Sequence, residues 1–287
     1  MAGLAPGGWG PVLTLFAMGG STLIIGAIID PLAGLLPLLG MLCLMASVFV
    51  GYFWRDPDRP VPRESGILIS PADGHVMFVR RERATGRRPS TSERTSATIE
   101  SDQHTGDWWP EPLDDVLGFA TEQRFEAVNK GEERENDVWR LAIFMSPLDV
   151  HVNRAPEAGV VERMELRIGK GRRRGPFVKA YRKESEFNER VRSVFRLEDG
   201  VRVEVTQISG ALARTILPYV SEGDALRRGQ RFGMIRLGSR VDVRVPADIY
   251  SPCVVSAEDK VPSLPKGEAV VAGRSVVFRH RTRNEEE

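Results

Sequence analysis

The chain has 287 residues, enough to bury one large core or two modest ones. The 40 Lys and Arg residues balance 39 Asp and Glu residues, and the resulting net charge of +1 at pH 7 argues against a nucleic-acid binder. The two cysteines, Cys43 and Cys253, lie far apart in the sequence, so the chain shows neither a disulfide framework nor a spacing typical of metal ligands.

The first 54 residues form an apolar segment in which Asp30 is the only charged residue. Two uncharged runs, 12–29 and 32–53, are about 18 and 22 residues long, close to the roughly 20 residues that cross a bilayer as a helix. No basic residue precedes the first run and a second run follows, which disfavours a cleaved signal peptide. Residues 1–54 are therefore predicted to form a transmembrane helical hairpin.

Three arginines, Arg55, Arg59 and Arg63, follow the second apolar run. By the positive-inside tendency, they predict that the polar remainder of the chain faces the cytoplasm at the cell membrane. A monotopic hairpin that dips into one leaflet fits the same sequence and stays open as an alternative.

The remainder of the chain, 55–287, is predicted to be one β-rich domain. Alternating apolar residues predict strands at 67–70, 139–145, 201–208 and 235–245, and long helical periodicity is scarce.

A short frame, Pro-x-x-Gly-x-Val, occurs at 71–76 and again at 156–161. Strand-and-turn units repeated in this way resemble the barrel-sandwich hybrid of lipoyl and biotinyl domains. Between 83 and 136 the sequence is rich in Ser, Thr, Arg and Glu, which predicts a largely disordered insertion. The predicted fold class is mainly β: a barrel-sandwich, lipoyl-like β domain preceded by the membrane hairpin.

Segment 235–245 places a serine where the strand pattern calls for a core residue. Ser239 shares the apolar side with Ile235, Leu237, Val241, Val243 and Val245, while Arg236, Arg240, Asp242 and Arg244 take the other side. Gly238 precedes it and allows backbone geometry that other residues resist. The pattern fits either a nucleophilic hydroxyl beside a deformable peptide bond or a core serine near a glycine bulge.

A hydroxyl nucleophile needs a group that takes its proton at neutral pH, and histidine is the usual partner. Of the four histidines, His280 lies in a charged tail and His104 in the predicted insertion. His151 is favoured over His75, because it follows an apolar strand within the polar cluster of 144–156. Taken alone, that cluster also fits a hydrogen-bonded turn.

Several short motifs follow one another along the chain. They are 54–59 (WRDPDR), 70–74 (SPADG), 144–156 (FMSPLDVHVNRAP), 188–190 (NER), 207–214 (QISGALAR), and 231–233 (RFG) running into 237–242 (LGSRVD). Together they resemble the membrane-bound phosphatidylserine decarboxylase proenzymes of the short type. The resemblance covers nearly all of the chain outside 83–136.

The resemblance implies a proenzyme that cuts itself between Gly238 and Ser239. Attack by the Ser239 hydroxyl and β-elimination would give a β chain of residues 1–238 and an α chain of residues 239–287. Ser239 would lose its nitrogen as ammonia and become a covalent pyruvoyl group, so neither an external cofactor nor a metal is expected.

For the cleavage step, the resemblance implies a relay of Asp73, His151 and Ser239, in which Asp73 orients His151. One departure from the family matters here. Long-type members carry two histidines in the corresponding segment, whereas Arg154 stands where the second would fall. Either His151 serves both maturation and decarboxylation, or His75 supplies the second function.

For the mature protein, the resemblance implies a lyase of phospholipid biosynthesis. Phosphatidylserine in the membrane would condense with the pyruvoyl ketone as a Schiff base and yield phosphatidylethanolamine and carbon dioxide, with His151 as proton donor. Asn188, Arg190 and Arg214 either contact the carboxylate or phosphate of the headgroup or tie loops together. The expected partners are the lipid and the chain's own α and β fragments, and a homo-oligomer stays open.

Two other functions compete with this interpretation. A pyruvoyl decarboxylase of a soluble amino-acid-like substrate shares the chemistry, but the two apolar runs give it no reason to sit on a membrane. A non-enzymatic, membrane-anchored barrel-sandwich adaptor accounts for the repeated frame and the hairpin, but leaves Ser239 on the apolar side unexplained.

Overall fold

The computed structural model describes residues 3–29, 34–84, 125–134, 137–167, 189–210, 215–236, 239–261 and 266–281. It divides into two compact units, described separately below. The hairpin unit comprises Met1–Arg59 and Pro147–His151, and the β unit comprises Pro60–Ser146 and Val152–Glu287. A short loop from the middle of the chain thus belongs to the N-terminal unit.

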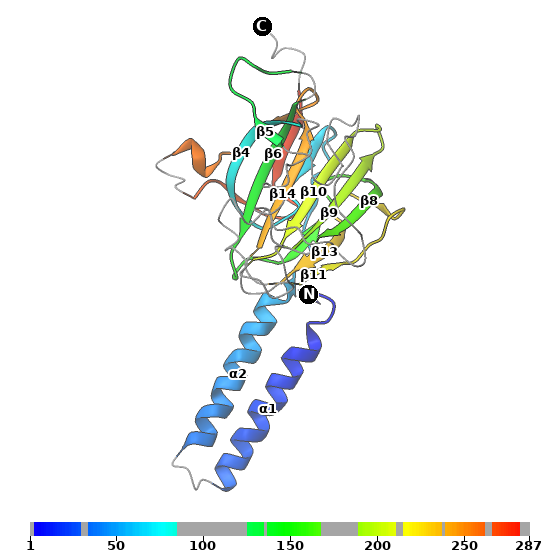
Figure 1. The fold of residues 1–287 in the computed structure, drawn as a ribbon. Coiled ribbons are helices and arrows are strands. Elements are labelled where there is room, and N and C mark those ends of the chain that lie inside the picture. Colours follow the sequence, from blue (N-terminus) through cyan, green and yellow to red (C-terminus); the bar gives the residue numbers. More distant parts are fainter. Residues whose placement is uncertain are drawn as a thin grey trace, which may run out of the picture. The chain divides into compact units, whose positions relative to one another are not determined.

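The hairpin unit is built on α1 (Trp9–Ile28) and α2 (Leu35–Phe53), which run side by side in Figure 1. Both helices are long and apolar enough to cross a membrane, which confirms the predicted apolar hairpin. Their outward side chains are large, apolar and exposed: Leu13, Phe16, Met18, Ile24, Ile25, Ile28, Leu35, Leu38, Leu39, Met41, Leu42, Met45, Val48 and Phe49. Beyond the helices, β1 (Gly3–Leu4) pairs with β2 (Arg55–Asp56).

Small residues let the two helices approach closely. A Cβ added at Gly19 would lie 2.9 Å from the Gly40 carbonyl oxygen, and one added at Gly40 would lie equally close, 2.9 Å, to the Gly19 oxygen. Ser47 Oγ donates a hydrogen bond to the Val12 carbonyl across the interface at 2.9 Å. Glycine contacts and hydroxyl bonds of this kind hold helices together where lipid removes the hydrophobic drive for association.

The β unit consists of short and medium strands. They are β3 (Ile67–Ile69), β4 (Gly74–Ala84), β5 (Phe125–Ala127), β6 (Asp137–Met145), β7 (Val152–Arg154), β8 (Gly159–Arg167), β9 (Arg190–Leu197), β10 (Arg202–Ile208), β11 (Ile216–Pro218), β12 (Ala225–Leu226), β13 (Arg231–Ile235), β14 (Ser239–Pro246), β15 (Tyr250–Pro252), β16 (Ala269–Val270) and β17 (Val276–His280). A single 3-10 turn, η2 (Ala257–Asp259), is also among the described elements. The prediction of a mainly β chain after the hairpin is confirmed.

Within the described residues, nine strands form the largest sheet, in the order β12-β8-β9-β10-β14-β6-β4-β16 with β5 beside β4. Figure 1 shows β4, β6, β14, β10, β9 and β8 following one another across it. Two three-stranded sheets, β11-β13-β7 and β15-β17-β3, complete the unit.

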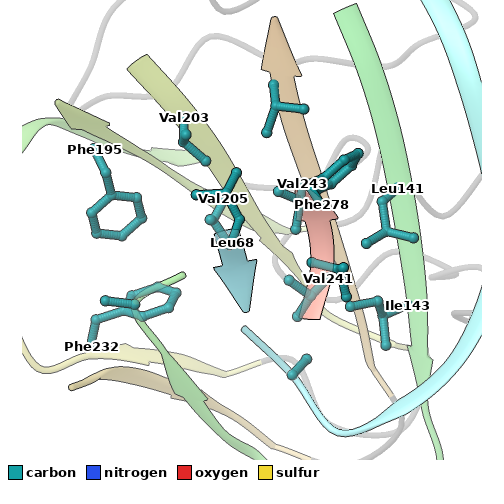
Figure 2. Packing of buried hydrophobic residues seen from close by; sticks show 14 of the residues in the cluster. Leu68, Leu141, Ile143, Phe195, Val203, Val205, Phe232, Val241, Val243 and Phe278 are labelled. Carbon is teal, nitrogen blue, oxygen red and sulfur yellow. The ribbon is translucent and has the colours of Figure 1, made fainter. Parts of the chain in front are cut away.

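The hydrophobic core lies between the large sheet and the small ones. Figure 2 shows apolar side chains of β6, β14 and β10 gathered around Leu68 of β3 and Phe278 of β17. Phe195 of β9 and Phe232 of β13 meet edge to face, with ring centroids 5.3 Å apart. The strands predicted at 67–70, 139–145 and 201–208 all contribute to this core, because their alternating residues point to one face.

The repeated Pro-x-x-Gly-x-Val frame has a structural counterpart. Gly74 opens β4 and Gly159 opens β8. A Cβ at Gly74 would lie 2.0 Å from the Phe144 carbonyl oxygen, and one at Gly159 would lie 2.5 Å from the Arg196 oxygen. Each glycine therefore allows a neighbouring strand to pass too close for any side chain.

Two sequence expectations differ from the structure. The strand predicted at 235–245 is split: Ile235 ends β13 in a small sheet, whereas Ser239 begins β14 in the large one. The alternation continues across the break, so periodicity alone could not reveal the change of sheet. Within the predicted insertion, β4 continues through Arg83 and β5 pairs with it, while 85–124 lie outside the described residues.

The face of the large sheet opposite the core carries a row of charged side chains, each at most 12% exposed. This charge ladder consists of Arg192 on β9, Glu204 on β10, Arg240, Asp242 and Arg244 on β14, Arg140 on β6 and Glu82 on β4. Glu204 accepts from Arg192 Nη2 at 2.5 Å and from Arg244 Nη1 at 2.6 Å. Asp242 accepts from Arg140 Nη2 at 2.6 Å and from Arg240 Nε at 2.5 Å.

The arginines determine the ionisation of the two central carboxyl groups. Burial alone would raise the pKa of Glu204, but Arg192 and Arg244 more than offset it and lower the pKa to about 2. Burial likewise opposes the charge on Asp242, and Arg240 and Arg140 lower its pKa to about 2. Glu204 and Asp242 are therefore ionised at neutral pH.

We predict that Asp242→Asn strongly destabilises the β unit, because it removes the buried carboxylate that binds the guanidinium groups of both Arg240 and Arg140. The expected loss is about 3–5 kcal/mol in the free energy of unfolding, measured by urea unfolding in detergent. Glu162→Gln is the matched control, because its partner Arg202 is 41% exposed and such surface pairs contribute about 0–1 kcal/mol. Equal losses in both variants would contradict a stabilising ladder.

The same carboxyl groups predict acid sensitivity. Their folded pKa values lie below the ordinary values of 3.8 and 4.5, so the stabilisation is fully present above those values and is lost as the pH falls toward 2. The free energy of unfolding should fall over this range in the unmodified chain, and less steeply in Asp242→Asn. Identical slopes would show that Asp242 does not carry the effect.

Candidate functional site

Ser239 is the first residue of β14 and is fully buried. It pairs with Met145, the last residue of β6, and its Oγ lies 3.3 Å from the Met145 sulfur. The prediction that this hydroxyl faces the core is confirmed, because Val241 and Val243 on the same side of the strand are also fully buried. Of the other predicted site residues, Gly238, Asn188 and Arg214 lie outside the described residues.

Asp73 lies in the loop between β3 and β4 and is 8% exposed. Its Oδ1 accepts a hydrogen bond from the Ala272 amide at 2.8 Å. The loop is held by Ser70, whose Oγ donates to the Ala72 carbonyl at 2.6 Å and whose backbone bonds to Gly273 and Ser275. The Asp73 carboxylate is therefore held in place by backbone groups.

Strand β6 brings the neighbourhoods of Asp73 and Ser239 together. On one side of Phe144 lies His75 of β4, and on the other lies Arg240 of β14. The starts of β4 and β14 thus flank the same end of β6, separated by two interstrand spacings, roughly 10 Å. Residues far apart in the sequence share one edge of the core.

His151 belongs to the hairpin unit and is fully buried. Its ring packs on Phe53 at the end of α2, with centroids 4.5 Å apart. Nδ1 lies 2.8 Å from the Asp149 carbonyl oxygen. Because a carbonyl oxygen only accepts, this bond holds the proton of a neutral imidazole on Nδ1 and leaves the lone pair on Nε2, the form that a general base requires.

The chain continues from His151 directly into β7, and β7 is bonded to the loop that carries Asp73. The Pro71 carbonyl accepts from the Arg154 amide at 2.9 Å and from Asn153 Nδ2 at 3.3 Å. The loop that carries Asp73 is therefore connected to β7 through hydrogen bonds, and His151 is connected to β7 through the backbone.

Two other predicted residues, Arg190 and His75, lie on strands of the large sheet. Arg190 opens β9 and is 8% exposed. His75 lies on β4 between β6 and β16. Arg154 is buried and donates from Nη1 to the Gly229 carbonyl at 3.1 Å. This arginine ties β7 to the turn before β13.

Sequence reasoning missed a buried amide pair, one member of which lies near the Met145 sulfur that Ser239 Oγ also contacts. Asn153 Oδ1 accepts from Gln207 Nε2 at 2.8 Å, and both side chains are fully buried. The Pro71 carbonyl fixes the orientation of the Asn153 amide, which in turn fixes that of Gln207. Gln207 Oε1 accepts no hydrogen bond from any residue that the structure describes. The signal was present in the sequence, because Gln207 shares the parity of Val203 and Val205 on β10.

The arrangement combines a hydroxyl, two amides and a held carboxylate at one edge of an apolar core, which is a dry setting for covalent chemistry. Among the described residues, no group of three His, Cys, Asp or Glu side chains could hold a metal ion. Ser239 Oγ and Asn153 Nδ2 both lie near the Met145 sulfur, at 3.3 Å and 3.9 Å.

Comparison with known proteins identifies a single family. The model of the phosphatidylserine decarboxylase family matches residues 46–277. A phosphatidylserine decarboxylase proenzyme of Symbiobacterium thermophilum is 35% identical over 242 residues, covering 84% of this chain and 83% of the relative. One of Granulibacter bethesdensis is 34% identical, covering 80% and 70%. A relative from Methanopyrus kandleri, 33% identical over 84% of this chain and 86% of its own, is named for archaetidylserine instead. No solved structure matches the chain.

We predict an energetic coupling between the two buried amides. Gln207→Met leaves Asn153 Oδ1 without its donor and should lower the free energy of unfolding by about 1–3 kcal/mol. Adding Asn153→Leu removes that acceptor, while the Pro71 carbonyl keeps its bond from the Arg154 amide. The double variant should therefore lose less than the sum of the single variants, by about 0.5–3 kcal/mol in urea unfolding. Additive losses would mean that the amides act independently.

Proposed function

Because this chain belongs to the phosphatidylserine decarboxylase family, we propose that it is a self-processing decarboxylase of a serine-headgroup phospholipid. The observation that carries the proposal is Ser239: it begins β14, and its hydroxyl is buried in the apolar core, 3.3 Å from the Met145 sulfur. The family match runs from the end of α2 to β17 and includes every proposed site residue.

Maturation starts from the Ser239 hydroxyl. Its Oγ attacks the Gly238 carbonyl carbon, the peptide C–N bond breaks, and the amide becomes an ester with a free amine. Removal of the Ser239 Cα proton then breaks the Cβ–O bond, and residues 1–238 depart with a carboxylate at Gly238. Water replaces the nitrogen of the remaining dehydroalanine and ammonia leaves, so that residues 239–287 begin with a pyruvoyl group.

The proton transfers are assigned to the relay of Asp73, His151 and Ser239. The Nδ1–H bond to Asp149 supports His151 as the base, because it leaves Nε2 able to take a proton. The Asp73 carboxylate is held by the Ala272 amide in a loop bonded to the strand that follows His151. His151 is also the proposed proton donor after decarboxylation, since Arg154 replaces the family's second histidine.

In the mature enzyme, the pyruvoyl ketone supplies an electrophile for the substrate amine and a sink for the electrons released when carbon dioxide leaves. The residues of this chain bind and orient the lipid around it. Arg190, with Asn188 and Arg214, is proposed to contact the carboxylate or phosphate of the headgroup. Relatives named for phosphatidylserine and for archaetidylserine share the serine part of the name, which is where the reacting amine and carboxylate lie.

The proposed location is the cell membrane, with the β unit in the cytoplasm. Support comes from the two apolar helices and from Arg55, Arg59 and Arg63 directly after them. A membrane anchor suits a diacyl substrate that does not leave the bilayer.

The first test is the intact mass of the purified protein under denaturing conditions. Cleavage at Gly238/Ser239 with pyruvoyl formation should give two chains whose summed mass exceeds that of the precursor by about 1 Da, whereas simple hydrolysis adds about 18 Da. Ser239→Ala should remain a single chain. Ser193→Ala is the matched control: Ser193 is also a fully buried serine of the large sheet, and its replacement should leave cleavage intact.

Carbon dioxide release then identifies the substrate. We expect release from phosphatidylserine in mixed micelles and none from free serine. Release from free serine instead would favour a decarboxylase of soluble substrates, and an intact single chain in all three proteins would favour the adaptor.

A further inference from the structure

Arg55 connects the loop Pro147–His151 to the end of the membrane hairpin. Arg55, two residues after α2, donates from Nη2 to the Leu148 carbonyl at 2.6 Å and from Nη1 to the Tyr52 carbonyl at 2.8 Å. Its guanidinium also lies 3.8 Å from the centre of the Tyr52 ring. Two hydrogen bonds and a cation–π contact therefore connect the helix end to the loop.

The loop has an inner and an outer side. Val150 and His151 are buried, and His151 packs on Phe53 of α2. Leu148 is 58% exposed, although its backbone is held by Arg55. A large apolar side chain is thus presented outward on the loop whose imidazole is held by the Asp149 carbonyl and by Phe53 of α2.

This exposed leucine lies at the aromatic end of the hairpin. Trp9 begins α1 and is 61% exposed, and Tyr52 near the end of α2 is 47% exposed. The two helix ends are joined, because the Ala5 amide bonds to the Trp54 carbonyl at 2.8 Å and β1 pairs with β2. Exposed tryptophan, tyrosine and arginine at the end of apolar helices are typical of the headgroup level of a bilayer.

We propose that Leu148 inserts into the lipid at this level and that Arg55 is a positioning residue that ties the His151 loop to the membrane surface. Lipid is the expected occupant, because Leu148 extends the exposed apolar surface of α1 and α2 onto the loop. His151 is then presented where a lipid headgroup lies, and membrane contact and imidazole orientation depend on each other. The positioning role of Arg55 toward His151 rests on the proposed function, whereas the insertion of Leu148 does not.

Insertion of Leu148 is tested on the uncleaved Ser239→Ala protein, so its result is independent of catalysis. Cys43 and Cys253 are first replaced by alanine, and Leu148→Cys is labelled with bimane in vesicles of phosphatidylcholine and phosphatidylglycerol. Lipids brominated near the headgroup should quench the label strongly and aqueous iodide weakly. Ile25→Cys, on the apolar surface of α1, and Asp199→Cys, in the exposed turn after β9, give the lipid and water reference values.

A label at 148 that behaves like the one at 199 would overturn the insertion. So would a label shielded from both quenchers, because that result would mean a protein partner, such as a second copy of the chain, covers Leu148.

The role of Arg55 is tested with Arg55→Met, Arg55→Lys and Arg63→Met. Arg63 is an exposed arginine later in the same basic segment of the sequence, so its loss matches the change in charge without breaking the loop contact. Arg55→Met should reduce lipid quenching at 148 and slow self-cleavage about 10- to 100-fold, with a shifted pH dependence of the rate, because the imidazole loses its fixed orientation. Arg55→Lys should recover part of the rate, and Arg63→Met should match the unmodified chain.

An unchanged pH profile and unchanged quenching in Arg55→Met would overturn the positioning role. If the unmodified chain does not cleave, the proposed function fails, whereas the quenching result for Leu148 still decides the membrane contact.

Discussion

The pairing of β14 with β6 is the constraint on which the rest of the β unit depends. Its register runs unbroken from Ser239 opposite Met145 to Pro246 opposite Val138. Side chains alternate between faces with a period of two, so this register sends Ser239 and the valines to the core and the charged residues to the other side. A slip by one residue would exchange the two sets, placing guanidinium groups in the core and turning Ser239 away from it.

The charge ladder fits that constraint. A buried ion pair contributes little net stability compared with apolar packing, but a mispaired one is costly. Glu204 and Asp242 each accept from arginines on two strands, so only one alignment of β9, β10, β14 and β6 satisfies both carboxylates. We infer that the ladder selects the register, while the apolar core opposite provides most of the stabilisation. The ladder on one face of the sheet and the apolar core on the other then both fix the position of Ser239.

Much of this arrangement could be predicted from the sequence, and the failures share one cause. Period-two alternation predicted three strands and the inward direction of Ser239, because alternation is a local property of the chain. It did not predict that the chain changes sheets between Ile235 and Ser239, since parity is preserved across the break. Nor did it predict the amide pair of Asn153 and Gln207 or the burial of Arg240, because these depend on partners many residues away. The packing of the loop Pro147–His151 within the hairpin unit is another such long-range contact.

The break between β13 and β14 also explains how a chain cut at this point would remain one folded unit. Strand β13 ends at Ile235 in a small sheet and β14 begins at Ser239 in the large one, so a cut before Ser239 would leave both described strands whole. The fragment 239–287 would keep β14 between β10 and β6, β16 beside β4 and β17 beside β3, each pair joining the two fragments. Its valines are buried in the shared core, and Asp242 is bonded to Arg140 of the other fragment. The backbone can therefore be opened beside Ser239 while hydrogen bonds, ion pairs and apolar packing hold the new terminus at the site.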